Sequence, residues 1–304
     1  MEFLRFLEGL RFPLMDTLMQ GITEFGSETI FLVAALVLYW CVDKRKGYYL
    51  MAVGFLGTIF NQFLKISCRI LRPWDRWDIS YVESAKAGAT GYSFPSGHSQ
   101  TAVGTFGVIA METKRTWLRA VSIALMILVP FSRMYLGVHT PADVLVGSLS
   151  ALALVLLLRP VVFGEKKWVF PSVLGVMIVC GVAFLLYMEL TTFPVDVLRE
   201  NLDHAHKNAY TLLGAMLGFL VGYIADVKKI HFSEKAVWWA QLLKAALGLG
   251  IAVALRAVLK APLTALFGGH NLAHGVRYFL VVLYAAAVWP MTFRWFEKLG
   301  GKTE

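Results

Sequence analysis

The sequence predicts an all-α, polytopic membrane protein, a bundle of about nine hydrophobic helices. The mean hydropathy is +0.63 and only 16% of the 304 residues are charged, which is too apolar for a soluble chain of this length. Apolar runs recur along the whole sequence. Several are long enough to cross a bilayer as α-helices of about 20 residues. A multi-pass helical bundle follows from these observations.

The apolar runs place the hydrophobic helices at 28–42, 47–69, 98–112, 116–133, 140–159, 168–190, 208–225, 236–259 and 275–293. Residues 1–27 precede them and mix Glu2 and Glu8 with Phe and Leu side chains, without a small-residue cleavage site. We therefore expect an amphipathic segment at the membrane surface there. Residues 28–160 contain all the motif-like spacing and form the predicted core. Residues 161–304 are predicted to add further, plainer membrane helices.

The distribution of basic residues predicts the orientation. Alternate loops each contain three: Lys44, Arg45 and Lys46; Lys114, Arg115 and Arg119; Arg159, Lys166 and Lys167; Lys228, Lys229 and Lys235; Arg294, Lys298 and Lys302. By the positive-inside rule these loops face the cytoplasm. In the loop 191–207 on the opposite side, Asp196, Glu200 and Asp203 offset Arg199 and Lys207. The same distribution accounts for the net charge of +9, so no nucleic-acid partner is expected.

Three clusters of polar residues are predicted to converge on the outer face. The first is Lys65 with Arg72 and Pro73, where a spacing of seven would put both cations on one helix face. The second is the stretch Pro95-Ser96-Gly97-His98, and the third joins Ser132-Arg133 to His139 and Asp143. Three cations, two histidines and a carboxylate at the ends of apolar helices are costly unless they share a ligand. Together they indicate a site for a polyanion.

Elementary chemistry suggests a role for each of these residues. Lys65, Arg72 and Arg133 can bind the nonbridging oxygens of a phosphoryl group. Ser96 and the Gly97 amide are predicted at a helix start, where free N–H groups favour an anion. Asp143 lies four residues after His139 and can fix its tautomer, so that the other ring nitrogen is a nucleophile. His98 is then free to act as a general acid.

These clusters resemble the K-x6-RP, PSGH and SR-x5-H-x3-D signature of the type-2 phosphatidic acid phosphatase superfamily, which includes vanadium haloperoxidases and bacterial acid phosphatases. Every signature position matches, in order, between Lys65 and Asp143. The resemblance implies that His139 becomes a phosphohistidine, Asp143 orients it and His98 protonates the leaving group. Lys65, Arg72, Ser96, Gly97 and Arg133 would hold the phosphate, with no metal and no other cofactor. The flanks "SFPSGHSQTA" and "GVHTPADV" look like the bacterial membrane branch.

The expected function is an integral-membrane hydrolase of a lipid phosphate or diphosphate, first of all undecaprenyl diphosphate in recycling of the cell-wall carrier. The expected location is the cell inner (plasma) membrane, with the site on the extracytoplasmic side. Phosphatidic acid, phosphatidylglycerol phosphate, a soluble phosphate ester and an acceptor other than water remain alternatives. A non-enzymatic anion or lipid transporter is a further alternative, although the repeat-like halves typical of transporters are not evident. The sequence does not indicate an oligomeric state.

The C-terminal part has histidines outside the signature, His204, His206, His270 and His274. In the predicted topology they lie on the outer side. His270 and His274 could share a helix face and bind a metal, but no nearby cysteine or acidic cluster completes such a site. Contacts with the membrane interface or with lipid headgroups, which Arg277 could join, are the favoured interpretation.

Overall fold

The computed structural model describes residues 2–166, 168–194 and 197–299. The predicted basic residues Lys167 and Lys302 and the predicted acidic residue Asp196 lie outside these ranges. The described residues contain helices and loops and no strand, as the composition predicts.

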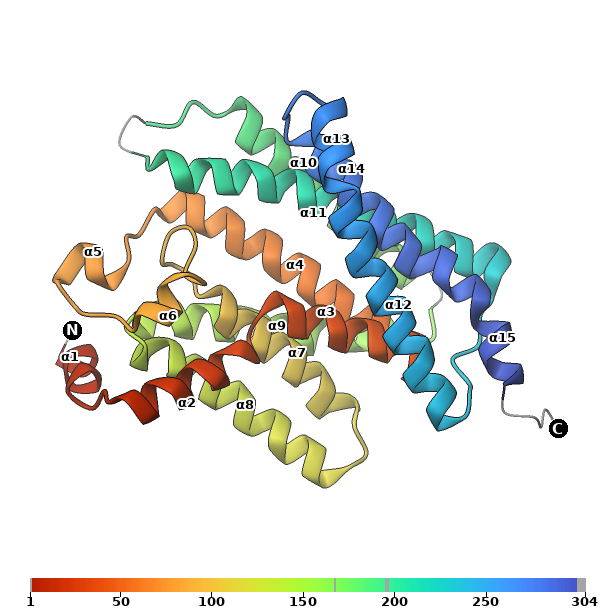
Figure 1. The fold of residues 1–304 in the computed structure, drawn as a ribbon, viewed down its shortest axis with the longest axis horizontal. Helices are drawn as coiled ribbons and strands as arrows, with labels where there is room; N and C mark the ends of the chain where they lie inside the picture. Colours follow the sequence, from red (N-terminus) through yellow and green to blue (C-terminus); the bar gives the residue numbers. More distant parts are fainter. Residues whose placement is uncertain (1, 167, 195–196, 300–304) are drawn as a thin grey trace. The chain divides into compact units, whose positions relative to one another are not determined.

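The helices can be followed in chain order in Figure 1. They are α1 (Glu2–Gly9), α2 (Pro13–Glu24), α3 (Glu28–Val37), η1 (Leu38–Val42), α4 (Lys44–Cys68), α5 (Pro73–Trp77), α6 (Glu83–Lys86), α7 (Gly97–Glu112), α8 (Thr116–Tyr135), α9 (Pro141–Phe163), α10 (Val169–Leu190), α11 (Arg199–Ala225), η2 (Asp226–Ile230), α12 (Trp238–Val258), α13 (Lys260–Leu266), α14 (Leu272–Leu283), η3 (Tyr284–Val288), η4 (Trp289–Thr292) and α15 (Phe293–Lys298).

Among the described residues, seven helical stretches are long and apolar enough to cross a membrane. They are Lys44–Trp77, Thr116–Tyr135, Pro141–Phe163, Val169–Leu190, Arg199–Ile230, Trp238–Leu266 and Leu272–Lys298. The pair Pro13–Glu24 and Glu28–Val42, bent by 43°, makes an eighth if it counts as one span. All nine predicted regions are helical, but α7 has only 16 residues and falls short of a span. The predicted number of nine is therefore approximate.

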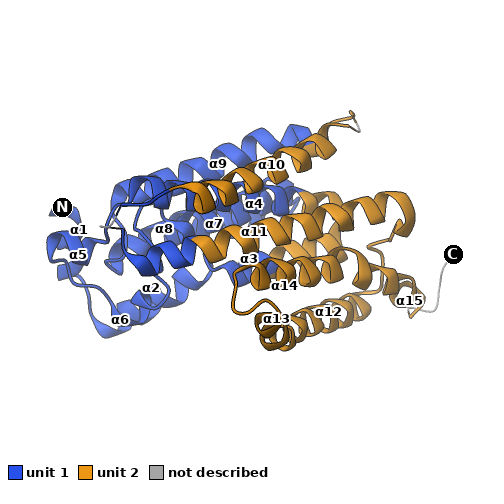
Figure 2. Ribbon diagram, turned by 90° about the horizontal axis from the view of Figure 1, so that it is seen from above, with its two compact units in different colours: residues 1–32, 49–161, 192–205 blue, residues 33–48, 162–191, 206–304 orange. Residues whose placement is uncertain are grey.

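The chain divides into two compact units, coloured separately in Figure 2. Unit 1 comprises residues 1–32, 49–161 and 192–205, and unit 2 comprises residues 33–48, 162–191 and 206–304. Helices α3, α4, α9 and α11 each contribute residues to both units. The predicted functional division into residues 1–27, 28–160 and 161–304 stays a prediction.

Unit 1 is built around α7. Most of this helix is buried, and it packs along α8, which also contacts α2 and α1. Ala102 and Phe106 of α7 form a core cluster with Val129 of α8. Leu4 and Leu7 of α1 are buried against Ile79. Helix α7 is therefore held in place by its contacts with α8.

Unit 2 contains a close contact between α11 and α14–η3, which depends on three glycines of α11. A Cβ at Gly214 would lie 2.0 Å from the Gly275 carbonyl oxygen. A Cβ at Gly218 would lie 2.6 Å from the Phe279 carbonyl oxygen, and one at Gly222 would lie 2.3 Å from the Ala286 Cβ. Small residues at every fourth position let two helix backbones come together inside a membrane. The sequence pattern Gly214-x3-Gly218-x3-Gly222 is the visible signal of this contact.

Candidate active site

Lys65 and Arg72 contribute two buried cations, but not from one helix as their spacing predicted. Helix α4 ends at Cys68, and Arg69 adopts a left-handed conformation with φ of 51°, so the chain leaves the helix before Arg72. Arg72 lies in extended backbone at the start of α5. The Lys65 ammonium donates to the Tyr92 carbonyl. The Arg72 guanidinium donates to the carbonyls of Thr90 (2.8 Å), Gly91 (3.2 Å) and Val138 (3.0 Å). The two cations therefore come from separate segments of the chain and not from one helix face.

The segment before α7 places a capped helix start beside these cations. Ser96 is the N-cap, and its hydroxyl accepts a hydrogen bond from the Ser99 amide at 3.3 Å. The Ser96 amide donates to the Asp143 carbonyl at 2.9 Å. Gly147 makes this approach possible, because a Cβ there would lie 2.5 Å from the Ser96 carbonyl oxygen. The first turns of α7 and α9 are thereby held together.

His98 lies in the first turn of α7. Its carbonyl meets the break between α2 and α3, where a Cβ at Gly26 would lie 2.7 Å from the His98 oxygen. Within the described residues the His98 imidazole has no hydrogen-bond partner, although it interacts electrostatically with the cations of the site. A ring fixed by its backbone and free at its nitrogens suits proton transfer to a ligand.

Arg133 is the third cation, in the last turn of α8 and only 1% exposed. One of its terminal nitrogens, Nη1, donates to the Thr23 hydroxyl at 3.0 Å. The other two guanidinium nitrogens, Nε and Nη2, are buried without a partner. Leaving such donors unpaired is costly, so this guanidinium indicates a site that an anion completes.

His139 and Asp143 form a pair at the start of α9. Asp143 Oδ2 lies 3.4 Å from His139 Nδ1, and Arg72 Nη1 lies 2.9 Å from His139 Nε2. A guanidinium only donates, so this network assigns the proton of the neutral ring to Nδ1 and the lone pair to Nε2. Thr140 fixes the carboxylate, since its amide donates to Asp143 Oδ2 at 2.8 Å and its hydroxyl accepts from the Asp143 amide.

Burial and positive charge make both imidazoles poor bases. His139 lies in the loop between two candidate spans, and burial lowers the pKa of its ring well below the usual range; Arg72, Arg133 and Lys65 lower it further. Burial and then Arg133, Arg72 and Lys65 lower the pKa of His98 to about 3. At neutral pH the ring of His139 is therefore unprotonated and keeps a lone pair for attack on an electrophile.

Two site residues were not predicted from the sequence. Ser93 donates from its hydroxyl to Asp143 Oδ2 at 2.5 Å and lies 3.5 Å from His139 Nδ1. Thr23, which holds Arg133, lies in the segment predicted at the membrane surface and is fully buried. Ser93 is part of the motif-like stretch before His98, so the sequence could have indicated it as a site residue. Thr23 is remote in sequence from the three clusters, and nothing in the sequence pointed to its contact with Arg133.

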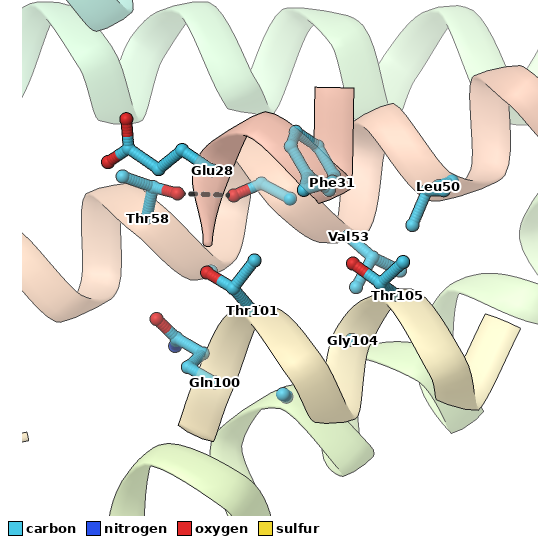
Figure 3. Close-up of a pocket in the computed structure, with 12 residues that line it drawn as sticks. Glu28, Phe31, Leu50, Val53, Thr58, Gln100, Thr101, Gly104 and Thr105 are labelled. Atoms are coloured by element: carbon cyan, nitrogen blue, oxygen red, sulfur yellow. Dashed lines mark hydrogen bonds between the residues drawn. The ribbon is translucent and has the colours of Figure 1, made fainter. Parts of the chain in front are cut away.

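Unit 1 also contains a pocket beside the first turns of α7, shown in Figure 3. It is lined by Glu28, Phe31, Leu50, Val53, Gly54, Gly57, Thr58, Gln100, Thr101, Gly104, Thr105 and Ala151. Thr58 donates its hydroxyl to the Gly54 carbonyl at 2.8 Å. The lining consists of one carboxylate (Glu28), one carboxamide (Gln100), hydroxyls, glycines and apolar side chains. It includes none of the predicted catalytic or phosphate-binding residues, so we assign it no catalytic role.

The C-terminal histidines His206, His270 and His274 belong to unit 2 and have polar neighbours of their own. His270 Nδ1 accepts from the Leu272 amide at 3.1 Å, and His274 Nδ1 lies 3.0 Å from Arg277 Nη2. His206 Nδ1 lies 3.3 Å from a Glu189 oxygen. Within the described residues, no group of three or more His, Cys, Asp or Glu side chains could hold a metal ion.

Comparison with known families matches most of the chain. Residues 45–167 match the PAP2 superfamily. Residues 210–302 match a second family, the PAP2 superfamily phosphatase, transmembrane extension. The first match contains every predicted site residue from Lys65 to Asp143, and the second contains Arg277 and most of the C-terminal helices. No solved structure matches the chain.

Three curated proteins are similar to parts of the chain. An undecaprenyl-diphosphatase of Sulfolobus acidocaldarius is 31% identical over 134 residues, 44% of this chain and 64% of that protein. Phosphatidylglycerophosphatase B of Bacillus subtilis is 28% identical over 170 residues, 52% and 79% of the two chains. A lipid A 4'-phosphatase of Bacteroides thetaiotaomicron is 25% identical over 160 residues, 49% and 70%. The chain thus spans just under two thirds of the first of these relatives.

Proposed function

Because this multi-pass membrane chain belongs to the PAP2 superfamily, we propose that it is a phosphatase that removes phosphate from a lipid phosphate or diphosphate. One observation supports this above all. His139 has a carboxylate near one ring nitrogen and a guanidinium at the other, and the buried Arg133 has two unpaired donor nitrogens. A phosphoryl group would pair those donors and present its phosphorus to the imidazole.

The proposed reaction has two displacements. In the first, Arg72 exchanges its hydrogen bond to His139 Nε2 for one to a phosphoryl oxygen. The lone pair released on Nε2 then forms a bond to phosphorus, the bond from phosphorus to the lipid oxygen breaks, and that oxygen receives a proton from His98. Asp143 accepts from the Nδ1–H and stabilises the positive ring. In the second, water attacks the phosphohistidine, His98 takes its proton, and inorganic phosphate leaves with the bond to Nε2 broken.

The site's cations set the protonation states for these steps. Burial, and then Arg72, Arg133 and Lys65, keep His139 neutral before the substrate arrives, which the nucleophile requires. They also disfavour the protonated His98 that the first step needs. A bound phosphate dianion acts in the opposite direction and favours protonation of His98. The proton therefore joins His98 together with the substrate, and charge balance is reached without a metal ion.

The substrate we propose first is undecaprenyl diphosphate, the substrate named for the relative with the highest identity of the three. Phosphatidylglycerol phosphate is the second candidate, by similarity to the phosphatidylglycerophosphatase. A lipid substrate fits a site at the ends of apolar helices, because its hydrocarbon can stay in the bilayer while the headgroup enters the cationic site.

A phosphate-release assay tests the proposed reaction. The purified chain in detergent is incubated with undecaprenyl diphosphate, phosphatidylglycerol phosphate, phosphatidic acid and a soluble phosphate ester, each with excess chelator. We expect release from the diphosphate to be fastest, unchanged by chelator and inhibited by vanadate, which mimics the five-coordinate transition state. Activity that disappears on chelation and returns with zinc or magnesium would refute metal independence. Absence of phosphate release from all four substrates would refute the function.

We also propose that the site faces away from the cytoplasm, since the basic loops lie at the opposite ends of the spans. Labelling of single cysteines tests this. All three native cysteines are first replaced by serine, because at least one of them, Cys68, is exposed. In this background, Ala87→Cys should react with an impermeant thiol reagent in intact cells. Thr113→Cys should react only after permeabilisation. The reverse pattern would invert the topology and place phosphate release in the cytoplasm.

A further inference from the structure

Arg277 of α14 is a third buried guanidinium besides Arg72 and Arg133, and it lies in unit 2, outside the proposed catalytic residues. It is 6% exposed. Its Nη2 lies 3.0 Å from His274 Nδ1, and its guanidinium carbon lies 5.3 Å from the centre of the Tyr278 ring. Its Nε is buried without a hydrogen-bond partner. Within the described part of the chain, no carboxylate forms an ion pair with it.

Further cations lie near His274 and Tyr278, the two neighbours of this guanidinium. Lys207 of α11 and Lys260 of α13 act electrostatically on His274 together with Arg277, and no carboxylate is among the groups that do so. Both lysines are exposed. Arg256 of α12 lies 5.8 Å from the centre of the Tyr278 ring. We call Lys207, Lys260, His274 and Arg277 the Arg277 cluster. It gathers positive charge from three helices.

The nitrogens of the cluster favour an anion over a metal ion. His274 Nδ1 accepts from Arg277, so in the neutral ring Nε2 carries the proton and is a donor. His270 Nδ1 is already an acceptor for the Leu272 amide. The next amides of α14 donate to His270 and Asn271 carbonyls, so the helix start offers no free N–H group. What the cluster offers is side-chain donors and positive charge.

We propose that the Arg277 cluster binds the phosphate group of an anionic lipid. Lys207 and Arg277 lie near the first residues of two candidate spans, Arg199–Ile230 and Leu272–Lys298, and Lys260 lies near the end of a third, Trp238–Leu266. These span ends are where lipid headgroups lie. Phosphate is the anion that lipids present there, and a guanidinium with lysines is a usual receptor for it. The transmembrane extension thereby gains a ligand of its own.

Counting bound lipids on the intact protein tests this site. The full chain in detergent is titrated with phosphatidylglycerol, phosphatidylcholine or inorganic phosphate, and bound molecules are measured by native mass spectrometry. Phosphatidylglycerol is a phosphodiester without a terminal phosphate for the catalytic site to remove. The variants are Arg277→Gln and the double variant Lys207→Gln/Lys260→Gln. The matched control is Lys229→Gln, an exposed lysine of the same unit at the other end of the α11–η2 stretch.

We expect Arg277→Gln and the double variant to weaken phosphatidylglycerol binding about tenfold. Lys229→Gln should bind phosphatidylglycerol as the wild type does, and phosphatidylcholine binding should be the same in all proteins. Hydrolysis of a soluble phosphate ester should be equal in all four proteins, so the site stands even if the proposed substrate is wrong. If Arg277→Gln does not fold, the double variant alone tests the proposal, because replacing two exposed lysines should leave the fold intact. Equal phosphatidylglycerol binding in all proteins would overturn the proposal. Cluster-dependent binding of inorganic phosphate, without preference for phosphatidylglycerol, would overturn the lipid assignment.

Discussion

The signature region of unit 1 and the end of unit 2 around Lys44 both bury charge, with different partners. In unit 1, Arg72 donates to three backbone carbonyls and a ring nitrogen, and Arg133 donates to a hydroxyl. In unit 2, Lys44 donates to the Asp226 carboxylate at 3.0 Å, and Tyr48 donates to the same oxygen at 3.0 Å.

The partners distinguish two kinds of buried charge: one that is available for a ligand, and one that is paired within the fold. Neutral carbonyls and hydroxyls orient a cation without cancelling its charge, so Arg72 and Arg133 can still attract an anion, which we propose is a phosphate. An ion pair with a buried carboxylate neutralises both partners, and it holds the start of α4 to the start of η2. Four substitutions test this distinction, taken in order of their expected effect on turnover.

The largest effect should come from His139→Ala. It removes the proposed nucleophile while leaving the cations, so turnover should fall at least about a thousandfold. Phosphate release by the purified variant measures this, and the melting temperature in detergent checks that it folds. The control is His206→Ala, a histidine of unit 2 beside Glu189, which should keep wild-type turnover. A His139→Ala enzyme with a tenth of the wild-type rate would exclude this residue as the nucleophile.

Arg133→Met should follow, with a loss of about a hundredfold in kcat/KM, because one set of donors to the transferring phosphoryl group is removed. It should also change the pH profile. Arg133 lowers the pKa of His139, so its removal raises that pKa and the ring becomes protonated at a higher pH. The acidic limb of kcat/KM therefore moves to higher pH. Arg119→Met, at the other end of α8, is the control, and an unmoved limb would contradict the electrostatic role of Arg133.

Ser93→Ala should have an intermediate effect of about tenfold. It removes the O–H donor to Asp143 Oδ2, and a hydrogen bond to a charged group is worth about 1.5–3 kcal/mol. The matched change is Ser122→Ala, where the hydroxyl only donates to the Leu118 carbonyl of its own helix. Equal rates for the two variants would show that Ser93 does not position the His139–Asp143 pair.

Lys44→Met should change stability and leave turnover within about twofold. It leaves the Asp226 carboxylate buried with only neutral donors, Tyr48 and the Phe232 amide. Breaking a buried pair costs about 3–5 kcal/mol, and the partial exposure of Lys44 places the expected loss at the lower end or below. Thermal unfolding in detergent measures it, with Lys229→Met as the control. The double variant Lys44→Met/Asp226→Asn should recover part of the loss, because no unpaired charge remains.

The predicted site residues differ in how well the sequence located them. His139 and Asp143 are four apart at a helix start, so local geometry placed them together before any tertiary contact was known. Lys65 and Arg72 were predicted on one helix face, but the left-handed Arg69 ends α4 first. The two cations reach the site through separate segments. Spacing alone could not reveal this, because a helix end depends on the local backbone conformation.

The sequence by itself determined the fold class, the family and the set of charged residues that we propose form the site. The fold class follows from the hydropathy of each helix, which depends only on the residues of that helix. The family follows from the signature, whose residues lie at fixed spacings within short segments. Tertiary structure decided which neutral groups hold these charges. Ser93 on Asp143, Thr23 on Arg133, and the close approach of Gly147 to Ser96 join segments up to 110 residues apart. It also decided that Arg277 is buried with an unpaired Nε. Such contacts depend on how helices pack in space, which no local pattern of residues records.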